Sequence, residues 1–104
     1  VEALGLPEDR WSLSYQSRIG PVKWLTPAST SAVVDLAKRG VTNVAVVAPA
    51  FVVDGLETLE ELEIELRETF IEAGGKDFRV VPCLNDEPTW VAGVHSLIER
   101  AFVA

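Results

Sequence analysis

The chain has 104 residues, of which 48% are hydrophobic, and nine Lys or Arg stand against sixteen Asp or Glu. This length and apolar content predict one folded domain over residues 1–104 and exclude a disordered chain. The formal charge of −7 argues against a nucleic-acid partner, and a single Cys cannot by itself make an internal disulfide or a four-thiolate metal site. The longest apolar stretch, residues 44–53, is about half of what a membrane-spanning helix needs.

The first third of the chain predicts a short strand followed by a long loop. Trp11–Tyr15 alternates apolar and small polar residues, which is typical of a strand. Gln16–Ser29 contains Gly20 and two prolines, so we expect no regular element there. Long loops in small domains are often functional. Trp24 in this loop suits an anchor on the domain as well as it suits a flat wall for a flat ligand.

Helices and strands alternate along the rest of the chain. In order, we expect a helix at Ser29–Arg39, a strand at Val44–Ala48, a helix at Leu56–Ala73, a strand at Phe78–Pro82 and a helix at Pro88–Val103. The run Val44–Ala48 is continuously apolar, which predicts a strand buried on both faces. This order of elements predicts an α/β fold, with right-handed crossovers onto a parallel sheet.

The helix expected at Leu56–Ala73 has an apolar face and an acidic face. At 100° per residue its core stripe is Leu56, Leu59, Leu62, Leu66, Phe70 and Ala73. The opposite side carries Glu57, Glu61 and Glu65, spaced four apart. One interpretation is an acidic face in water. The other is a hydrated line of oxygen ligands that passes cations or protons inward to Glu57, because hard divalent cations favour such ligands.

The loops after the predicted strands are the candidate ligand sites, since parallel sheets bind ligands at the carboxyl ends of their strands. Gly55 stands alone in the second of these loops, which excludes a dinucleotide-binding or P-loop motif. In the first loop, Arg18 could hold an anionic group or pair with a carboxylate. We interpret His95 as a structural or surface residue, because no Cys or other His lies at metal-ligand spacing, and Cys83 as a small core residue.

Three stretches of the chain resemble the carboxy-terminal half of the ferrochelatase family. They are Tyr15–Pro21 followed by Trp24 and Leu25, then Phe51–Glu65, then Pro82–Asp86. The resemblance implies a three-layer αβα fold with a parallel sheet, similar to one half of the chelatase, flavodoxin or periplasmic-binding-protein folds. It also implies that the whole enzyme inserts ferrous iron into protoporphyrin IX to make haem, in the cytoplasm or at a membrane surface.

The resemblance also implies roles for individual residues. Glu57 matches the active-site carboxylate, which works across the porphyrin from a histidine. Glu61 and Glu65 match acidic positions along a helix with a π-type distortion, so that Glu57, Glu61 and Glu65 are the expected metal-binding residues. The expected substrate-binding residues are Gln16, Ser17, Arg18, Ile19, Trp24, Phe51 and Asp54.

The chain departs from the family pattern at Val53, where Ser is usual, and at Gly55, where Cys or His is common. The family's catalytic histidine belongs to the amino-terminal half, and His95 does not match it. We therefore expect that the chain alone does not insert iron, that it requires no cofactor and that it cannot supply an iron–sulfur cluster by itself.

The expected partner is the amino-terminal half of the same enzyme, which normally packs against this one. Exposed apolar surface at Trp24, Ile19 and Leu4–Leu6 would then permit self-association. Two alternatives are a non-catalytic tetrapyrrole- or metal-binding module with a chelatase-like fold, and a flavodoxin-like interaction domain whose acidic helix faces water.

Overall fold

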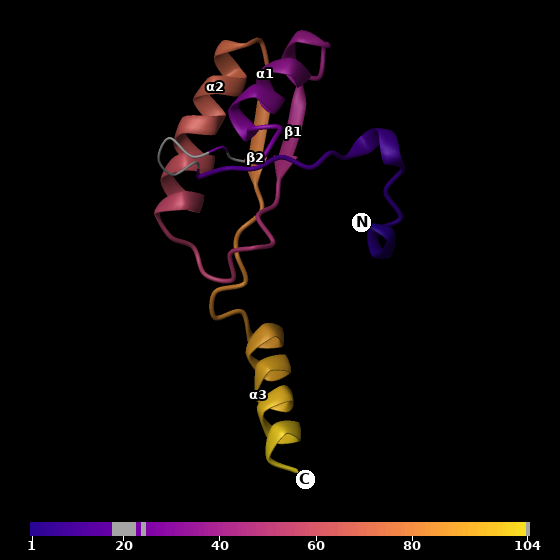
Figure 1. The fold of residues 1–104 in the computed structure, drawn as a ribbon, viewed down its shortest axis with the longest axis vertical. Helices are drawn as coiled ribbons and strands as arrows, with labels where there is room; N and C mark the ends of the chain where they lie inside the picture. The colour runs from indigo at the N-terminus through magenta and orange to yellow at the C-terminus, as the bar shows by residue number, and fades with distance from the viewer. Residues whose placement is uncertain (18–22, 24, 104) are drawn as a thin grey trace.

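The structure is a computed structural model that describes residues 1–17, 23 and 25–103. Two 3₁₀ turns, η1 (Glu2–Leu4) and η2 (Glu8–Arg10), precede the main elements. These are α1 (Ser29–Lys38), β1 (Asn43–Val46), the π-helix η3 (Glu57–Leu66), α2 (Arg67–Glu72), β2 (Asp77–Val80) and α3 (Pro88–Phe102) (Figure 1). The α/β class and the positions of the three predicted helices are confirmed.

The sheet consists of two parallel strands. β1 pairs with β2 from Asn43 opposite Asp77 to Val46 opposite Val80. The strand expected at Trp11–Tyr15 is wrong for the described residues, in which only an isolated bridge joins Tyr15 to Ala28. The reason is that the backbone of Tyr15 bonds to the segment just before α1: its amide donates to the Pro27 carbonyl at 2.9 Å and its carbonyl accepts from Ser29.

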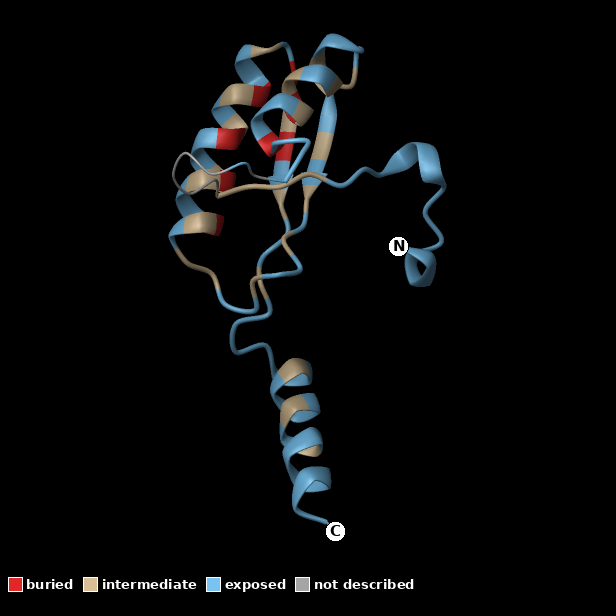
Figure 2. Ribbon diagram, in the orientation of Figure 1, coloured by how far each residue is buried: buried red, intermediate tan, exposed pale blue. Residues whose placement is uncertain are grey.

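The core lies between one face of this sheet and the helices α1, η3 and α2 (Figures 1 and 2). Its buried apolar residues are Val33, Leu62, Leu66, Phe70 and Phe78. The rings of Phe70 and Phe78 tilt against each other, with centroids 5.9 Å apart. Such an aromatic pair adds about 1 kcal/mol to what its burial contributes.

The second face of the sheet is exposed. Burial alternates along β1, where Val44 and Val46 face the helices and Asn43 and Ala45 are exposed. The prediction that this strand is buried on both faces is therefore wrong, because no described element packs on its far side. The described residues form two layers, helices on a sheet, and the third layer stays a prediction.

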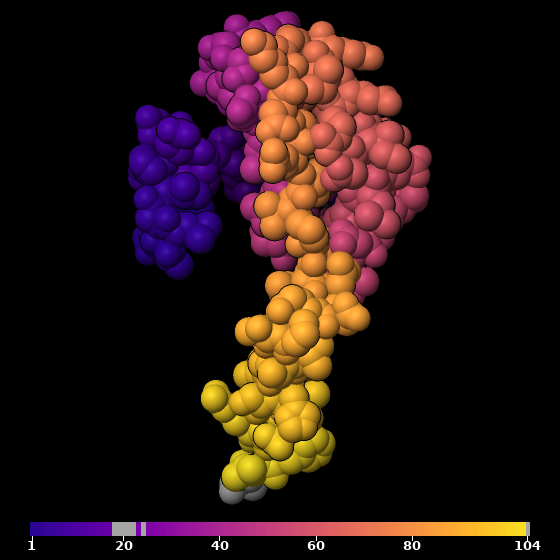
Figure 3. All heavy atoms as spheres, turned by 180° about the vertical axis from the view of Figure 1, so that it is seen from behind, coloured from indigo at the N-terminus to yellow at the C-terminus, as the bar shows by residue number. Residues whose placement is uncertain are grey.

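α3 projects away from the rest of the molecule (Figures 1 and 3). It begins where Glu87 accepts a hydrogen bond from the Trp90 amide, with Pro88 in the first turn, and none of its residues is buried. The radius of gyration is 16.6 Å, against about 13 Å for a compact domain of this length. Exposed apolar residues include Leu4, Leu6, Leu97, Ile98 and Phe102. The expected exposure at Leu4–Leu6 is confirmed, whereas Trp24 and Ile19 lie outside the described residues.

The π-helix changes which side chains of the long helix are buried. The π distortion implied by the family resemblance is confirmed over Glu57–Leu66. A π turn, with its i→i+5 hydrogen bonds, holds more residues than the 3.6 of an α turn, so residues four apart align along the axis. Thr58, Leu62 and Leu66 accordingly form the buried line of η3, and Phe70 continues it in α2. The predicted core positions Leu56 and Leu59 are wrong, being 68% and 56% exposed.

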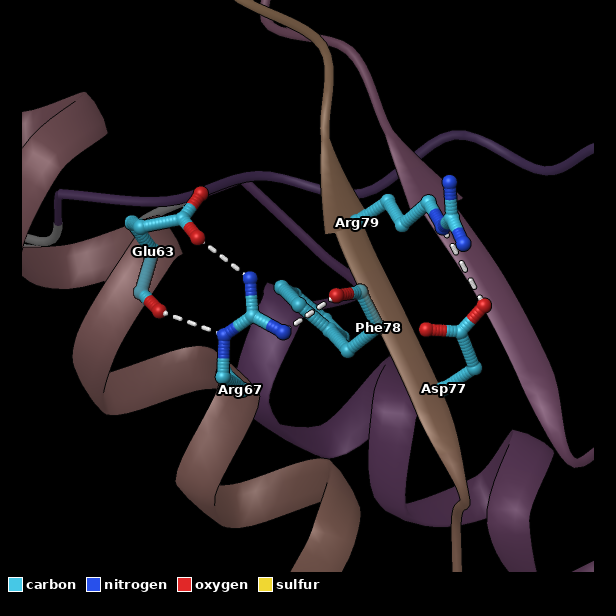
Figure 4. A network of polar contacts seen from close by, with 5 residues as sticks. All are labelled: Glu63, Arg67, Asp77, Phe78 and Arg79. Atoms are coloured by element: carbon cyan, nitrogen blue, oxygen red, sulfur yellow. Dashed lines mark hydrogen bonds and ion pairs between the residues drawn. The ribbon is translucent and has the colours of Figure 1, made fainter.

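Arg67 joins the end of the π-helix to β2 (Figure 4). Its guanidinium Nε donates to the Glu63 carbonyl at 3.0 Å, and its two terminal nitrogens donate to the Glu63 carboxylate and the Phe78 carbonyl. The guanidinium carbon also lies 5.4 Å from the centre of the Phe78 ring. The Arg67 side chain therefore links β2 to the junction between the π-helix η3 and the α-helix α2.

Replacing this side chain should destabilise the fold. Arg67→Met removes three hydrogen bonds and the cation–π contact, with an expected loss of about 1–3 kcal/mol in the free energy of unfolding, measured by urea denaturation. Arg79→Met is the matched control, because the Arg79 side chain is largely exposed and its Nε lies 3.2 Å from Asp77 Oδ2 at the surface. We expect it to change stability by less than about 0.5 kcal/mol. Equal losses in the two variants would contradict the assigned role of Arg67.

Candidate functional site

The site forms where the two strands end. Because β1 and β2 are parallel, the loops that follow them leave the sheet at the same edge. Hydrogen bonds join these two loops. The backbone amide of Asn85 donates to the Val52 carbonyl at 2.9 Å, and the backbone amide of Asp54 donates to the side-chain oxygen of Asn85 at 2.8 Å. The first loop then runs directly into η3, at Glu57.

Asp54 is held by side chains from both sides. Asn85 Nδ2 donates to Asp54 Oδ2 at 2.7 Å, and Thr58 Oγ1 donates to Asp54 Oδ1 at 2.8 Å. These hydrogen bonds, that of Asn85 first, lower the pKa of Asp54 below its ordinary 3.8. Its charged form therefore stabilises the folded loops above that pH, and the contribution is lost as the pH falls through the lowered value.

Cys83 lies beside this carboxylate and is half-buried. Burial and the neighbouring Asp54 together raise the pKa of its thiol above the usual 9.0. At neutral pH the thiol is therefore protonated and a weak nucleophile. Cys83 does not belong to the buried core, so its interpretation as a small core residue is not confirmed.

The loop that carries the predicted porphyrin-binding residues touches the acidic face of η3. Ser17 Oγ donates to Glu61 Oε2 at 2.7 Å. Gln16 Nε2 lies 3.3 Å from Ser17 Oγ and 3.4 Å from the Glu57 carbonyl, and donates to both. Ser17 has a φ of 61°, in the left-handed region that non-glycine residues seldom adopt, and such strain clusters at functional sites.

The acidic residues form a row rather than a chelating cage. Glu57 and Glu61 are half-buried and Glu65 is exposed. Within the described ranges, no group of three Asp, Glu, His or Cys side chains converges closely enough to hold a metal ion. The Glu57 carboxylate lies against Gly55, where an added Cβ would stand 3.2 Å from Glu57 Oε2. Gly55 thus leaves room for the carboxylate at the start of the row.

The remaining predicted site residues divide into two groups. Phe51 is half-buried in the loop after β1. Arg18, Ile19 and Trp24 lie outside the described residues, and their predicted contacts stay predictions. His95 lies on α3, away from the site, with its side chain 72% exposed and 3.8 Å from Glu99. Its interpretation as a surface residue is confirmed.

Sequence reasoning missed Thr58 and Asn85. Thr58 is only 2% exposed, yet a polar residue in the first turn of a helix gave no reason to expect burial. A usable signal was its spacing, since Asp54 precedes it by four residues at a helix start, where side-chain hydrogen bonds are common. Asn85 lies in the third stretch that resembles the family, but nothing in its local pattern indicates a partner 31 residues away.

The family model for ferrochelatase matches residues 1–102. The chain belongs to the ferrochelatase family. It is 48% identical over 104 residues to the ferrochelatase of Pseudomonas fluorescens (strain Pf0-1), a match over 100% of this chain and 30% of the relative. It is 50% identical over 99 residues to the ferrochelatase of Bordetella pertussis (strain Tohama I), over 95% of this chain and 27% of the relative. The chain thus spans about 30% of the length of the curated ferrochelatases it matches.

Family membership favours a piece of a ferrochelatase over the alternative of an unrelated flavodoxin-like interaction domain. The described part of the chain contains no helix that combines the length and the apolar character needed to cross a bilayer. Both the acidic row and the loop that touches it fall inside the part of the chain matched by the ferrochelatase model.

Proposed function

We propose that this chain supplies the carboxylate half of a ferrochelatase active site, and that the full-length protein inserts ferrous iron into protoporphyrin IX. The observation that carries the proposal is the contact between Ser17 and Glu61, at 2.7 Å. It brings the loop proposed to bind the porphyrin against the row of acids proposed to deliver the iron, across 44 residues of sequence.

The reaction requires what such a row can provide. Iron insertion removes two protons from the pyrrole nitrogens and strips water from the metal ion. A half-buried carboxylate beside the ring can accept one of these protons, and this is the role proposed for Glu57; the opposing histidine of the amino-terminal part would accept the other. Glu61 and Glu65 would exchange water for carboxylate oxygen step by step, since they stand apart rather than enclosing the ion. Distortion of the porphyrin, supplied by binding energy, would expose its nitrogen lone pairs.

The porphyrin itself would contact the loop after Tyr15. Trp24 and Ile19 are proposed to touch the macrocycle, with Arg18, Gln16 and Ser17 beside it. Phe51 and Asp54 are proposed to lie at the mouth of the acidic path. Ferrous iron is a substrate in this proposal, and no cofactor is required of this chain.

The amino-terminal part of the enzyme is the proposed partner. It would bring the opposing histidine and cover the exposed face of the sheet. The residues that directly follow the two strands, Val47 and Val81, are 65% and 48% exposed. The exposed apolar residues of α3 would also pack against this amino-terminal part. We place the whole enzyme in the cytoplasm, with peripheral membrane contact as an alternative.

Porphyrin binding and iron insertion can be tested separately. We expect protoporphyrin to quench the tryptophan fluorescence of the 104-residue chain and Trp24→Ala to abolish most of that quenching. Trp90→Phe, a change in α3, should leave it unchanged. Insertion of iron should occur with the full-length protein and not with this chain alone. Equal quenching in the wild-type and Trp24→Ala chains would contradict the loop assignment, and insertion by the chain alone would refute the division of the site between two halves.

A further inference from the structure

The first turn of η3 is fixed by a set of hydrogen bonds that we call the clasp, formed by Asp54, Thr58 and Asn85. Asn85 binds the Asp54 amide with its side-chain oxygen and the Asp54 carboxylate with its side-chain nitrogen, at 2.8 and 2.7 Å. The same nitrogen donates to the Cys83 carbonyl at 3.2 Å. Asn85 has a φ of 48°, a left-handed conformation that Asn tolerates better than most residues.

The clasp continues from Asp54 into the helix. The hydroxyl of Thr58, which is almost fully buried, donates to Asp54 Oδ1 at 2.8 Å and accepts from the Gly55 amide at 3.0 Å. Both carboxylate oxygens of Asp54 therefore have a protein partner. The carboxylate acts here as an acceptor between two loops.

The clasp ends at the proposed catalytic group. Thr58 is the neighbour of Glu57 in the chain, and the Glu57 carboxylate rests against Gly55, whose amide Thr58 binds. A shift of the Asp54–Gly55 segment would therefore move the backbone against which the Glu57 carboxylate packs. Misplacement of a reacting group by about 1 Å can cost roughly 100-fold in rate.

We propose that Asn85 is a positioning residue for iron insertion, acting through Asp54 and Thr58 to hold Glu57 against Gly55. This rests on the proposed function. It also assigns Asp54 a role in the protein scaffold in place of a direct contact with the metal ion. The two roles predict different kinetics, because a scaffold residue alters kcat whereas a ligand at the mouth of the path alters the KM for iron.

The exchange of the two side chains provides the decisive test. In the full-length protein, Asn85→Asp places two carboxylates against each other. Asp54→Asn leaves one acceptor oxygen where two are used, so either the Asn85 nitrogen or the Thr58 hydroxyl loses its partner at position 54. Each single variant should lower kcat about 10- to 100-fold, with the KM for iron within about twofold of wild type. The double variant Asp54→Asn/Asn85→Asp restores a donor opposite an acceptor and keeps an oxygen for the Thr58 hydroxyl, but it loses the hydrogen bond from position 85 to the Cys83 carbonyl. We therefore expect it to recover most, but not all, of the lost kcat.

Thr58 supplies a second, independent pair of variants. Thr58→Ser keeps the hydroxyl that bridges Asp54 and Gly55, whereas Thr58→Val keeps the shape and removes it. We expect Thr58→Ser to retain most of the activity and Thr58→Val to lose it as the single Asn85 variant does. Equal activity in the two would overturn the proposed chain of contacts.

Amide hydrogen exchange tests the clasp without reference to activity. In the 104-residue chain, Asn85→Ala should speed hydrogen exchange at the Asp54 backbone amide at least about tenfold. The double variant Asp54→Asn/Asn85→Asp should restore the protection of this amide. Unchanged protection overturns the clasp itself. A raised KM for iron with unchanged kcat in Asp54→Asn, not corrected in the double variant, overturns the positioning role and assigns Asp54 to the metal. If the wild-type full-length protein inserts no iron, the proposed function is overturned. The catalytic role of Asn85 is then overturned as well, even where hydrogen exchange shows that the clasp exists.

Discussion

Gly75→Ala is expected to cost about 3 kcal/mol of stability, the upper end of what overpacking a core usually costs. Gly75 is buried beside Phe70, and a Cβ at this position would overlap three atoms of the Phe70 ring. Phe70 is fully buried at the centre of the core, so its ring has no free space to enter. The Gly75 amide also donates to the Phe70 carbonyl at 2.9 Å, which ties the backbone to the same residue. Overpacking at such a site forces shifts throughout the core.

Thermal and urea unfolding of the 104-residue chain measure this effect. Gly93→Ala is the matched control, because Gly93 lies in α3 and a Cβ there would meet nothing within 4 Å. This control should be neutral, or should stabilise the helix by up to about 1 kcal/mol. A Gly75→Ala chain as stable as Gly93→Ala would show that the core can rearrange around the added methyl group.

Glu57→Gln in the full-length protein is expected to reduce kcat for iron insertion by about 100- to 10,000-fold, the range associated with a lost general base. The change keeps the size of the side chain and removes its charge, so the fold and porphyrin binding should persist. The reduction should appear in kcat at saturating porphyrin and iron.

Glu60→Gln provides the control for charge on the same helix. Glu60 is exposed and is not a member of the row proposed to carry iron, although it lines a shallow hollow that also includes Glu65 of that row. We expect its activity to stay within about twofold of wild type. Similar losses in the two variants would indicate a general effect of helix charge and would remove the special role of Glu57.

The sequence predicted the order of elements better than the packing around them. The helix expected at Ser29–Arg39 is observed at Ser29–Lys38, because Gly40 adopts a left-handed conformation that ends it. The prediction of a strand at Trp11–Tyr15 was wrong because alternation of residue types indicates which side chains share a face, but it does not show that a neighbouring strand is available for pairing. The two-sided burial of Val44–Ala48 failed because it depends on a layer that the described chain does not contain.

The site was predicted in part for similar reasons. Glu57 and Glu61 could be placed in one row from their spacing alone, and the π-helix aligns that spacing even better than an α-helix does. The assumption of 100° per residue nevertheless placed Leu56 and Leu59 in the core. The hydrogen bonds of Asn85 connect loops far apart in the sequence, and no local periodicity encodes such contacts.

A sheet of two strands has no central strand. Within the described chain, β1 and β2 pair only with each other, so each presents an outer row of backbone amides and carbonyls to whatever approaches from the side. Because each strand is only four residues long, few backbone groups are open to pairing with another chain, but some remain. Expressed alone, the chain should therefore recruit further strands, either from its own copies as ordered aggregates or, in the intact enzyme, from the remainder of the polypeptide as the sheet is extended.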